Sequence, residues 1–266
     1  MANTMTGAPT RYLRELRVLE QLAHTQHSQT LSMLAQRLDL PKTSLMRLLA
    51  TLVEAGFVIK APGEQGFLPG PRAARLAVSI LSTPYFSRSA RAILSQLVGA
   101  TGESCNLTAL EGDSMRYLER VETHHPLRLS MEVGAHVPLH CTATGKLMLA
   151  FMDDAARQAV LDRITLASHT PRTLTQRDVL EQDLAITRQR GIGIDHEEFI
   201  LGMVAVAVPV FDGKGRMIAA IASHGPTARV LLPFLLNQIP RMRDAAERME
   251  KVFADTALSP TPPAHD

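Results

Sequence analysis

One group of side chains is spaced as on a single helix face and is suited to contact DNA. Basic, hydroxylated and compact residues follow Pro41 directly, with an arginine one turn further on: Lys42, Thr43, Ser44, Met46 and Arg47. Little steric bulk lets a helix enter the major groove, hydroxyl and ammonium groups donate to phosphates, and an arginine fork pairs with guanine. The pattern indicates a DNA-reading helix. The alternative is an ordinary helical hairpin whose polar face is only solvated.

A second group is suited to hold an anion. The run Thr142-Ala143-Thr144-Gly145 opens an apolar segment with helical character. Backbone N–H groups at the start of a helix lack partners within it, and the helix dipole is positive there, so a ligand carboxylate fits. The alternative is that Thr142 or Thr144 only caps the helix through its hydroxyl.

Histidines are frequent in the middle of the chain, but their spacing indicates no metal site. The candidates match no compact zinc pattern: His124, His125, His136, His140 and Cys141. The pair at 136 and 140 falls in a proline-containing loop rather than on one helix face. Cys105 and Cys141 are expected to be buried thiols. We therefore predict no metal and no cofactor.

Catalytic chemistry is not indicated either. The sequence has no Gly-flanked serine, and sequence adjacency alone does not make His140 and Cys141 a base and a nucleophile. The nearest acid pair is Glu197-Glu198, and neighbouring side chains on a strand point to opposite faces. We predict no catalytic residue and no enzyme activity.

Two short helical patterns position the DNA-reading group. They are separated at Asp39-Leu40-Pro41, where proline suits the first helical position because its missing N–H would be unpaired there. The second helix carries an apolar stripe that must face a core: Leu45, Leu48, Leu49 and Leu52. Two β-prone runs, 57–60 and 67–68, surround a Pro-Gly-rich turn and indicate a hairpin wing. Together these elements form a winged helix-turn-helix.

A helix over residues 10–23 precedes this motif. The residues expected on its buried face are Tyr12, Leu16, Leu19 and Ala23. Its arginines, Arg11, Arg14 and Arg17, are interpreted as solvated charges, of which one can touch a phosphate.

The second half of the chain predicts an antiparallel sheet with helices on its faces, an α+β architecture. Strands are expected at ESCNLTAL (103–110), MRYLERV (115–121), RLSMEV (128–133), MVAVAVPVF (203–211) and MIAAIAS (217–223). Helices are expected over 87–102, where Gly102 is a good C-terminal stop, and over 143–152, 176–190 and 232–254.

An apolar helical run, PRAARLAVSIL at 71–81, links the two halves. Its apolar side chains can pack on their own domain or pair with a second copy of the chain: Leu76, Val78, Ile80 and Leu81. A dimer is the expectation, because one reading helix covers too few base pairs for useful specificity.

The length of the chain and the distribution of its charges indicate two domains, one of which binds the phosphates of a nucleic acid. The 266 residues exceed the usual size of one domain, and residues 1–75 hold nine Lys or Arg against five Asp or Glu, whereas the remainder holds 19 against 21. No apolar run reaches the roughly 20 residues of a membrane helix, and the N-terminus lacks the apolar core of a signal peptide. We expect a cytoplasmic protein without a membrane partner.

Several runs resemble the IclR family of bacterial transcription regulators. In the first half they are LSMLAQRLDLPKTSLMRLLATLVEAGFV at 31–58 and FLPG at 67–70; in the second half they are PLHCTATGKLMLAF at 138–151, PRTLT at 171–175, GIGIDHEEFILGMVAVAVPVFD at 191–212 and AAIASHGPTAR at 219–229. The resemblance covers nearly the whole chain, because the second-half segments match in order and spacing.

The resemblance implies a domain plan and a pocket. The plan is a mobile arm (1–9), a winged helix-turn-helix DNA-binding domain (10–70), a linker helix (71–85), a GAF-like effector-binding domain (86–256) and a disordered tail (257–266). The residues that match the family's pocket for a small organic acid are Ala143, Thr144, Asp195, Ala205, Ala222 and His224. Alanines stand at some positions that are polar in other family members.

The expected function is therefore a ligand-responsive regulator of a catabolic operon. It would bind double-stranded operator DNA as a homodimer or a dimer of dimers, as repressor or activator, and sense a small organic acid, with hydroxy and aromatic acids as candidates. The alternative is a metabolite-binding or metal-dependent enzyme with an appended winged helix.

The expected ligand is a hydroxy acid, aliphatic or phenolic. Its carboxylate would meet the helix start at 143–145, and its hydroxyl would meet Asp195 or His224, because a second negative charge beside Asp195 would be repelled. Its carbon skeleton would contact Met131, Leu139, Met203 and Ala205.

Overall fold

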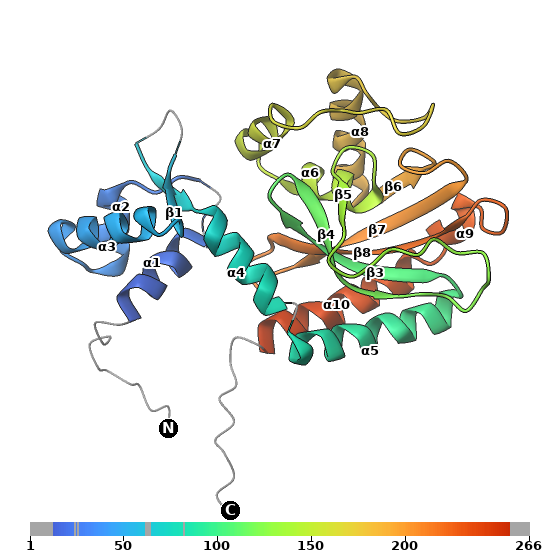
Figure 1. The fold of residues 1–266 in the computed structure, drawn as a ribbon, viewed down its shortest axis with the longest axis horizontal. Helices are drawn as coiled ribbons and strands as arrows, with labels where there is room; N and C mark the ends of the chain where they lie inside the picture. The colour runs from blue at the N-terminus through green and yellow to red at the C-terminus, as the bar shows by residue number, and fades with distance from the viewer. Residues whose placement is uncertain (1–12, 24, 26, 62–64, 82, 256–266) are drawn as a thin grey trace, which may run out of the picture. The chain divides into compact units, whose positions relative to one another are not determined.

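The computed structural model describes residues 13–23, 25, 27–61, 65–81 and 83–255 (Figure 1). The predicted arm and tail lie outside the described residues, as do Arg11 and Tyr12. The chain divides between Ser79 and Ile80 into two compact units.

The N-terminal unit is built from three helices and a two-stranded hairpin. Its elements are α1 (Arg14–Ala23), α2 (Leu31–Leu38), α3 (Lys42–Glu54), β1 (Val58–Lys60) and β2 (Phe67–Pro69), followed by α4 (Pro71–Leu81). β1 and β2 pair antiparallel, which confirms the predicted wing. The stripe of α3 packs inward as its spacing predicts: Leu45, Leu49 and Leu52 are buried, and Leu48 is half-buried.

The buried face of α1 differs from the predicted one. Val18 and Leu22 are fully buried, and Leu19, which was predicted, packs against them half-buried. The predicted Leu16 is instead 52% exposed, and Ala23 is exposed. Leu16 lies about 200° around the helix from Val18, so the two cannot share a face. The sequence of this helix contains two apolar stripes. The stripe that contains the β-branched Val18 packs into the core of the unit.

The C-terminal unit is one six-stranded antiparallel sheet between two helical layers. Its elements are α5 (Pro84–Thr101), β3 (Ser104–Glu111), β4 (Ser114–Val121), β5 (His136–Pro138), α6 (Ala143–Phe151), α7 (Asp154–Leu161), α8 (Arg177–Arg190), β6 (Gly193–His196), β7 (Met203–Phe211), β8 (Met217–Pro226), α9 (Leu232–Leu236) and α10 (Ile239–Asp255). The strand order is β5-β4-β3-β8-β7-β6. Helices α5 and α10 cover one face, and α6 backed by α8 covers the other (Figure 1). The predicted α+β architecture is confirmed.

Two elements of this unit were predicted wrongly. The closing helix expected over 232–254 is divided into α9 and α10, because Pro240 cannot continue a preceding helix and instead lies in the first turn of α10. RLSMEV at 128–133 is not a strand; the short edge strand is β5, at 136–138.

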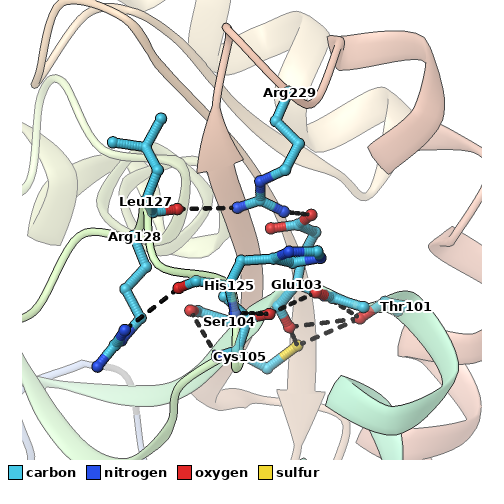
Figure 2. Close-up of polar contacts among 10 residues, drawn as sticks. Thr101, Glu103, Ser104, Cys105, His125, Leu127, Arg128 and Arg229 are labelled. Carbon is cyan, nitrogen blue, oxygen red and sulfur yellow. Dashed lines mark hydrogen bonds and ion pairs between the residues drawn. The ribbon is translucent and has the colours of Figure 1, made fainter.

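Arginine side chains hold the segment around RLSMEV in place of strand pairing. Arg120 donates to the carbonyl of Leu129, and Arg128 Nε lies 2.7 Å from Glu122 Oε2. Figure 2 shows Arg229 between the carboxylate of Glu103, with which it forms an ion pair, and the carbonyl of Leu127, 3.1 Å from its Nη2. The carbonyls of Leu127 and Leu129 thus accept from arginine side chains rather than from a neighbouring strand, which alternation in the sequence cannot reveal.

Both cysteines are free and buried, as predicted. Burial raises the pKa of the Cys105 thiol to about 12, so the thiol stays protonated. Among the helices that the structure describes, none combines the length and the apolar character needed to cross a membrane.

Candidate functional site

The outward face of α3 carries the predicted DNA-reading residues. Lys42, Thr43, Met46 and Arg47 are exposed there, and Ser44 is half-buried. Because Leu45, Leu49 and Leu52 anchor the opposite side in the core, the face presents these side chains on a rigid element. The structure places the five on one surface; that they contact DNA stays a prediction.

A tight turn sets the angle between α2 and α3. Asp39 ends α2 in the left-handed conformation, with φ at 52°, and the N–H of Leu40 donates to the carbonyl of Ala35 at 3.1 Å. Thr30 caps the start of α2 by accepting from the N–H of Met33. Pro41 is the N-cap of α3 rather than its first residue, so the helix begins at Lys42, one residue later than expected.

The wing is tied to the segment that precedes α2. Gln29 and Phe67 exchange two backbone hydrogen bonds, at 3.0 and 2.9 Å, and Gln29 is buried. Lys60 on β1 is exposed and adds a cation to this unit. The arrangement of three helices and a wing can place α3 in a major groove while the wing follows the backbone.

The C-terminal unit contains a pocket whose floor is formed by two rows of residues across the sheet. Strand pairing sets Asp195 opposite Ala205 and Ala205 opposite His224, so these three side chains share a face. The adjacent row pairs Ala222 with Asn106. Because the alanines are short, they leave a hollow between the polar side chains of Asp195, His224 and Asn106.

The start of α6 covers this floor. Gly193 makes the close approach possible, since a Cβ there would lie 2.0 Å from the carbonyl oxygen of Ala143. Gly145 likewise fits α6 against Leu139, whose carbonyl oxygen would be 2.4 Å from an added Cβ. The cavity between the floor and α6 has a volume of about 50 Å³. It is smaller than the roughly 150 Å³ cavity that accepts benzene, which favours a short-chain ligand over an aromatic ring.

Helix capping and free N–H groups coexist at this helix start. Thr142 Oγ1 accepts from the N–H of Gly145 at 3.1 Å and donates to the carbonyl of Pro138 at 2.7 Å, so the capping alternative holds for Thr142. Within the described ranges, the backbone N–H groups of Ala143 and Thr144 have no hydrogen-bond partner. Both residues line the cavity, so these donors remain for an anion.

Burial shifts the pKa values of two side chains that line the pocket, Asp195 and His224, toward their neutral forms. Burial raises the pKa of Asp195 to about 7. The backbone N–H groups of Glu198 and Phe199 donate to its Oδ1 and lower the pKa, but burial has the larger effect. Burial lowers the pKa of His224 to about 3, and the positive charge of Arg120 acts in the same direction. In the part of the chain described here, neither ring nitrogen of His224 nor Oδ1 of Asn106 has a hydrogen-bond partner.

A buried lysine anchors the loop that follows β6. Lys146 is 2% exposed, and its Nζ lies 2.6 Å from Glu198 Oε1 and 3.0 Å from Asp183 Oδ2. Burial alone would lower the pKa of Lys146, but the charges of Glu198 and Asp183 outweigh it and raise the pKa. The ion pair connects α6 and α8 to the 197–200 loop, whose Phe199 and Ile200 line the cavity.

All six residues that the resemblance implied for the pocket line this one cavity, and their role in binding an effector stays a prediction. Sequence reasoning missed several lining residues: Asn106, Tyr117, Leu129, Val137, Phe199, Ile200 and Val204. Of the residues expected to contact the ligand's carbon skeleton, Met203 and Ala205 line the cavity, whereas Met131 and Leu139 belong to the neighbouring hydrophobic core.

The residues considered for catalysis or metal binding are arranged differently from the sequence expectation. Glu197 and Glu198 lie in a loop, not on a strand, and Glu197 has a φ of 65°. Glu197 pairs with Arg172 and Glu198 with Lys146, so they do not act as a pair. Among the histidines, His140 lies beside Cys141, and the fold adds His169, which the spacing did not bring into consideration.

Comparison with known proteins matches both units. The family described as IclR helix-turn-helix domain matches residues 13–62, and the one described as bacterial transcriptional regulator IclR C-terminal matches residues 79–251. A Cupriavidus necator protein named "Probable transcriptional regulator SauR" is 40% identical over 91% of this chain and 96% of its own length. The transcriptional repressor IclR of Escherichia coli K12 is 32% identical over 85% of this chain and 83% of its own.

A solved structure resembles the C-terminal half. It is the inducer-binding domain of a double mutant of the PobR transcription factor from Acinetobacter, in complex with 3-hydroxybenzoic acid. It is 27% identical, with a TM-score of 0.57, over 62% of this chain and 97% of that one.

Proposed function

The chain belongs to the IclR family of bacterial transcription regulators, and on that premise we propose that it controls a catabolic operon in response to a short-chain hydroxy acid. Members of this family are DNA-binding regulators rather than enzymes, which removes the enzyme alternative. The observation that carries the proposal is the pair of free N–H groups at the start of α6, facing buried polar groups that lack partners.

The carboxylate of the ligand binds the N–H groups of Ala143 and Thr144. Both residues line the cavity, and the positive end of the α6 dipole adds to the attraction of their N–H groups for a negative charge. Asp195 would repel that charge if it were ionised, but a pKa of about 7 lets it bind a proton instead. The conflict between an anionic ligand and an acidic pocket residue is thereby resolved.

The hydroxyl of the ligand donates to His224 or Asn106. The Oδ1 of Asp195 already accepts two backbone N–H groups, whereas His224 and Asn106 offer acceptors without partners in the described structure. A buried acceptor left unpaired costs about 1–3 kcal/mol, so a ligand that supplies the missing donor is selected. The relative with bound 3-hydroxybenzoic acid supports this class, because that ligand also combines a carboxylate with a hydroxyl.

Hydroxy acids are therefore expected to raise the melting temperature more than their deoxy counterparts. At about 100 times its dissociation constant, a ligand stabilises by about 2.7 kcal/mol, which a thermal-shift measurement resolves. The pairs to compare are glycolate with acetate, lactate with propionate, and 3-hydroxybenzoate with benzoate. His224→Ala should narrow the difference within each pair. Equal shifts from both members of every pair would contradict the assignment, and a larger shift from the aromatic pair would show that the cavity opens.

Affinity for the acid is expected to fall as pH rises through about 7. Below that pH Asp195 is neutral and the anion is not repelled; above it the ionised carboxylate opposes binding, by up to about tenfold per pH unit. Calorimetric titration at about pH 6 and about pH 8 measures the change. Asp195→Asn is the matched control, because it keeps an oxygen for the N–H groups of Glu198 and Phe199 but does not titrate. A pH dependence that persists in Asp195→Asn would assign it to another group.

Assembly through α4 is part of the proposal. Leu76 and Ile80 lie one turn apart on this helix and are 47% and 49% exposed, whereas Val78 is buried. Exposed apolar residues at this spacing suit contact with a second copy of the helix, and a dimer matches an operator with two half-sites. The side chain of Leu81 lies outside the described residues.

Leu76→Asp is expected to reduce the mass measured by light scattering and to weaken operator binding. A buried, unpaired carboxylate between two copies of α4 would cost more than the contact contributes. Ala74→Asp introduces the same charge about 160° around the helix and should leave the mass unchanged. If Leu76→Asp keeps the parent mass, α4 does not form the interface.

Coupling between ligand and DNA requires that the acid bind one arrangement of the protein better than another. A ligand shifts such an equilibrium only by its difference in affinity for the two states, and DNA then changes ligand affinity by the same factor. Because its partner is chromosomal DNA, we place the protein in the cytoplasm, with no membrane partner.

A further inference from the structure

Three side chains outside the effector pocket are arranged to hold a metal ion. His140, Cys141 and His169 each offer one ligand atom, and these three atoms lie within 4.8 Å of one another. We propose that they form a binding site for a transition-metal ion that accepts thiolate and imidazole ligands, such as Zn²⁺. The site does not depend on the identity of the effector.

Two separate segments supply the ligands. His140 and Cys141 lie between β5 and α6, and His169 lies between α7 and α8. His140 and Cys141 are buried, whereas His169 is exposed. A metal would therefore join the segment that starts α6 to a segment distant in sequence. That long-range arrangement is why spacing along the chain gave no indication of the site.

The surroundings of His140 resemble those of a metal ligand. Its Nε2 lies 2.9 Å from the carbonyl oxygen of Ala167, which orients the ring and leaves the lone pair of Nδ1 for another partner. Metal-binding histidines commonly use their second ring nitrogen in this way, donating to a carbonyl or carboxylate.

The geometry requires only a small closing movement. In a tetrahedral zinc site with Zn–S near 2.3 Å and Zn–N near 2.1 Å, ligand atoms stand about 3.5 Å apart. The ring of His169 can make this movement because it is exposed, while its backbone N–H is fixed by Thr173 Oγ1 at 3.0 Å. Its ring centroid lies 5.8 Å from that of His140 and 5.4 Å from that of Phe199.

The donor set selects the metal. One thiolate and two imidazoles suit Zn²⁺ and other borderline or soft ions, whereas Mg²⁺ and Ca²⁺ require oxygen ligands. On binding, the S–H bond of Cys141 breaks, its proton passes to solvent, and a sulfur–metal bond forms without any change in oxidation state. Three protein ligands leave the fourth position for water on the exposed side of His169.

The site adjoins the effector pocket on two sides. Cys141 directly precedes Thr142, the cap of α6, and the ring of His169 contacts Phe199, which lines the pocket. A bound ion would fix both walls relative to each other. Metal binding would therefore be a second signal, besides the effector, that acts on the C-terminal unit.

Cobalt titration of the full chain, after removal of metals by a chelator, tests the proposal. Co²⁺ bound by a thiolate gives a sulfur-to-metal charge-transfer band, and Zn²⁺ should then displace it. Cys141→Ser should abolish the band, although Cys105 is retained. His169→Ala should weaken Zn²⁺ binding at least about tenfold, and it removes an exposed side chain, so the fold is expected to persist. His124→Ala, an exposed histidine of another loop, is the matched control and should bind as the parent does.

Two results would overturn the site. One is a parent protein that shows no charge-transfer band when Co²⁺ is added. The other is a parent-like affinity for Zn²⁺ in His169→Ala, with circular dichroism confirming that the variant is folded.

Discussion

Lys146→Met is expected to lower the free energy of unfolding by about 3–5 kcal/mol. Methionine fills much of the same volume, so the loss comes from electrostatics: Glu198, itself buried, would keep its charge in the protein interior without the ammonium group 2.6 Å away. The same change would release the 197–200 loop from α6 and weaken the effector response, because Phe199 and Ile200 of that loop line the cavity.

Urea denaturation with and without a second substitution separates this effect from packing. In Lys146→Met combined with Glu198→Gln, the one partner of Lys146 that keeps its charge is Asp183, whose side chain is 35% exposed to solvent, so much of the lost stability should return. Arg163→Met is the comparison for an ordinary ion pair, since Arg163 and Asp113 are 54% and 41% exposed and their contact contributes about 1 kcal/mol or less. A loss below about 1 kcal/mol in Lys146→Met would mean that Glu198 is protonated or reaches solvent in the folded protein.

Arg47→Ala is expected to weaken binding to the specific operator by about 1–3 kcal/mol, which is roughly a 5- to 150-fold rise in the dissociation constant. Arg47 is exposed on the face of α3 opposite the buried leucines, so its removal leaves the core intact. An arginine that pairs with a base edge matters for the specific sequence and much less for random DNA. Fluorescence anisotropy with both DNAs measures the two losses.

Lys42 provides the matched comparison on the same helix. It lies at the first position of α3, where we expect its ammonium group to contact phosphate rather than a base edge. Lys42→Ala should weaken binding to both DNAs by a similar factor and reduce the salt dependence. Equal losses on the two DNAs for Arg47→Ala would show that Arg47 also contacts only the backbone.

Local patterns predicted most of the helices and the wing correctly. The stripe at Leu45, Leu49 and Leu52 repeats with the helical period and has one interpretation, so α3 was placed to within a residue. In α1 the sequence carries two stripes, and only the packing of the three helices selects Val18 and Leu22. The local pattern predicts the buried face of a helix when only one face is apolar, and it fails when two faces are apolar.

The pocket was predicted unevenly because strand pairing joins residues far apart in the chain. Asp195 and His224 were found through the family resemblance, but Asn106 enters the pocket only because β3 pairs with β8, beside Ala222. Lys146 gave no signal, since a lysine in the apolar run of α6 resembles an ordinary surface residue until its two carboxylate partners are seen. The proximity of His169 to His140 and Cys141 was also not predicted, because these residues are far apart in the sequence.

We propose that an acid bound in the C-terminal unit controls sequence-specific DNA binding by the N-terminal unit. The most direct test of this proposal is binding of the purified chain to DNA from upstream of its own gene and to scrambled DNA of equal length, at moderate salt, with and without the best hydroxy acid of the thermal-shift series. We predict a preference for the upstream DNA of about a thousandfold or more, and a change in that specific affinity alone when the acid is added. Equal affinity for the two DNAs, or a specific affinity that no acid alters, would contradict the claim.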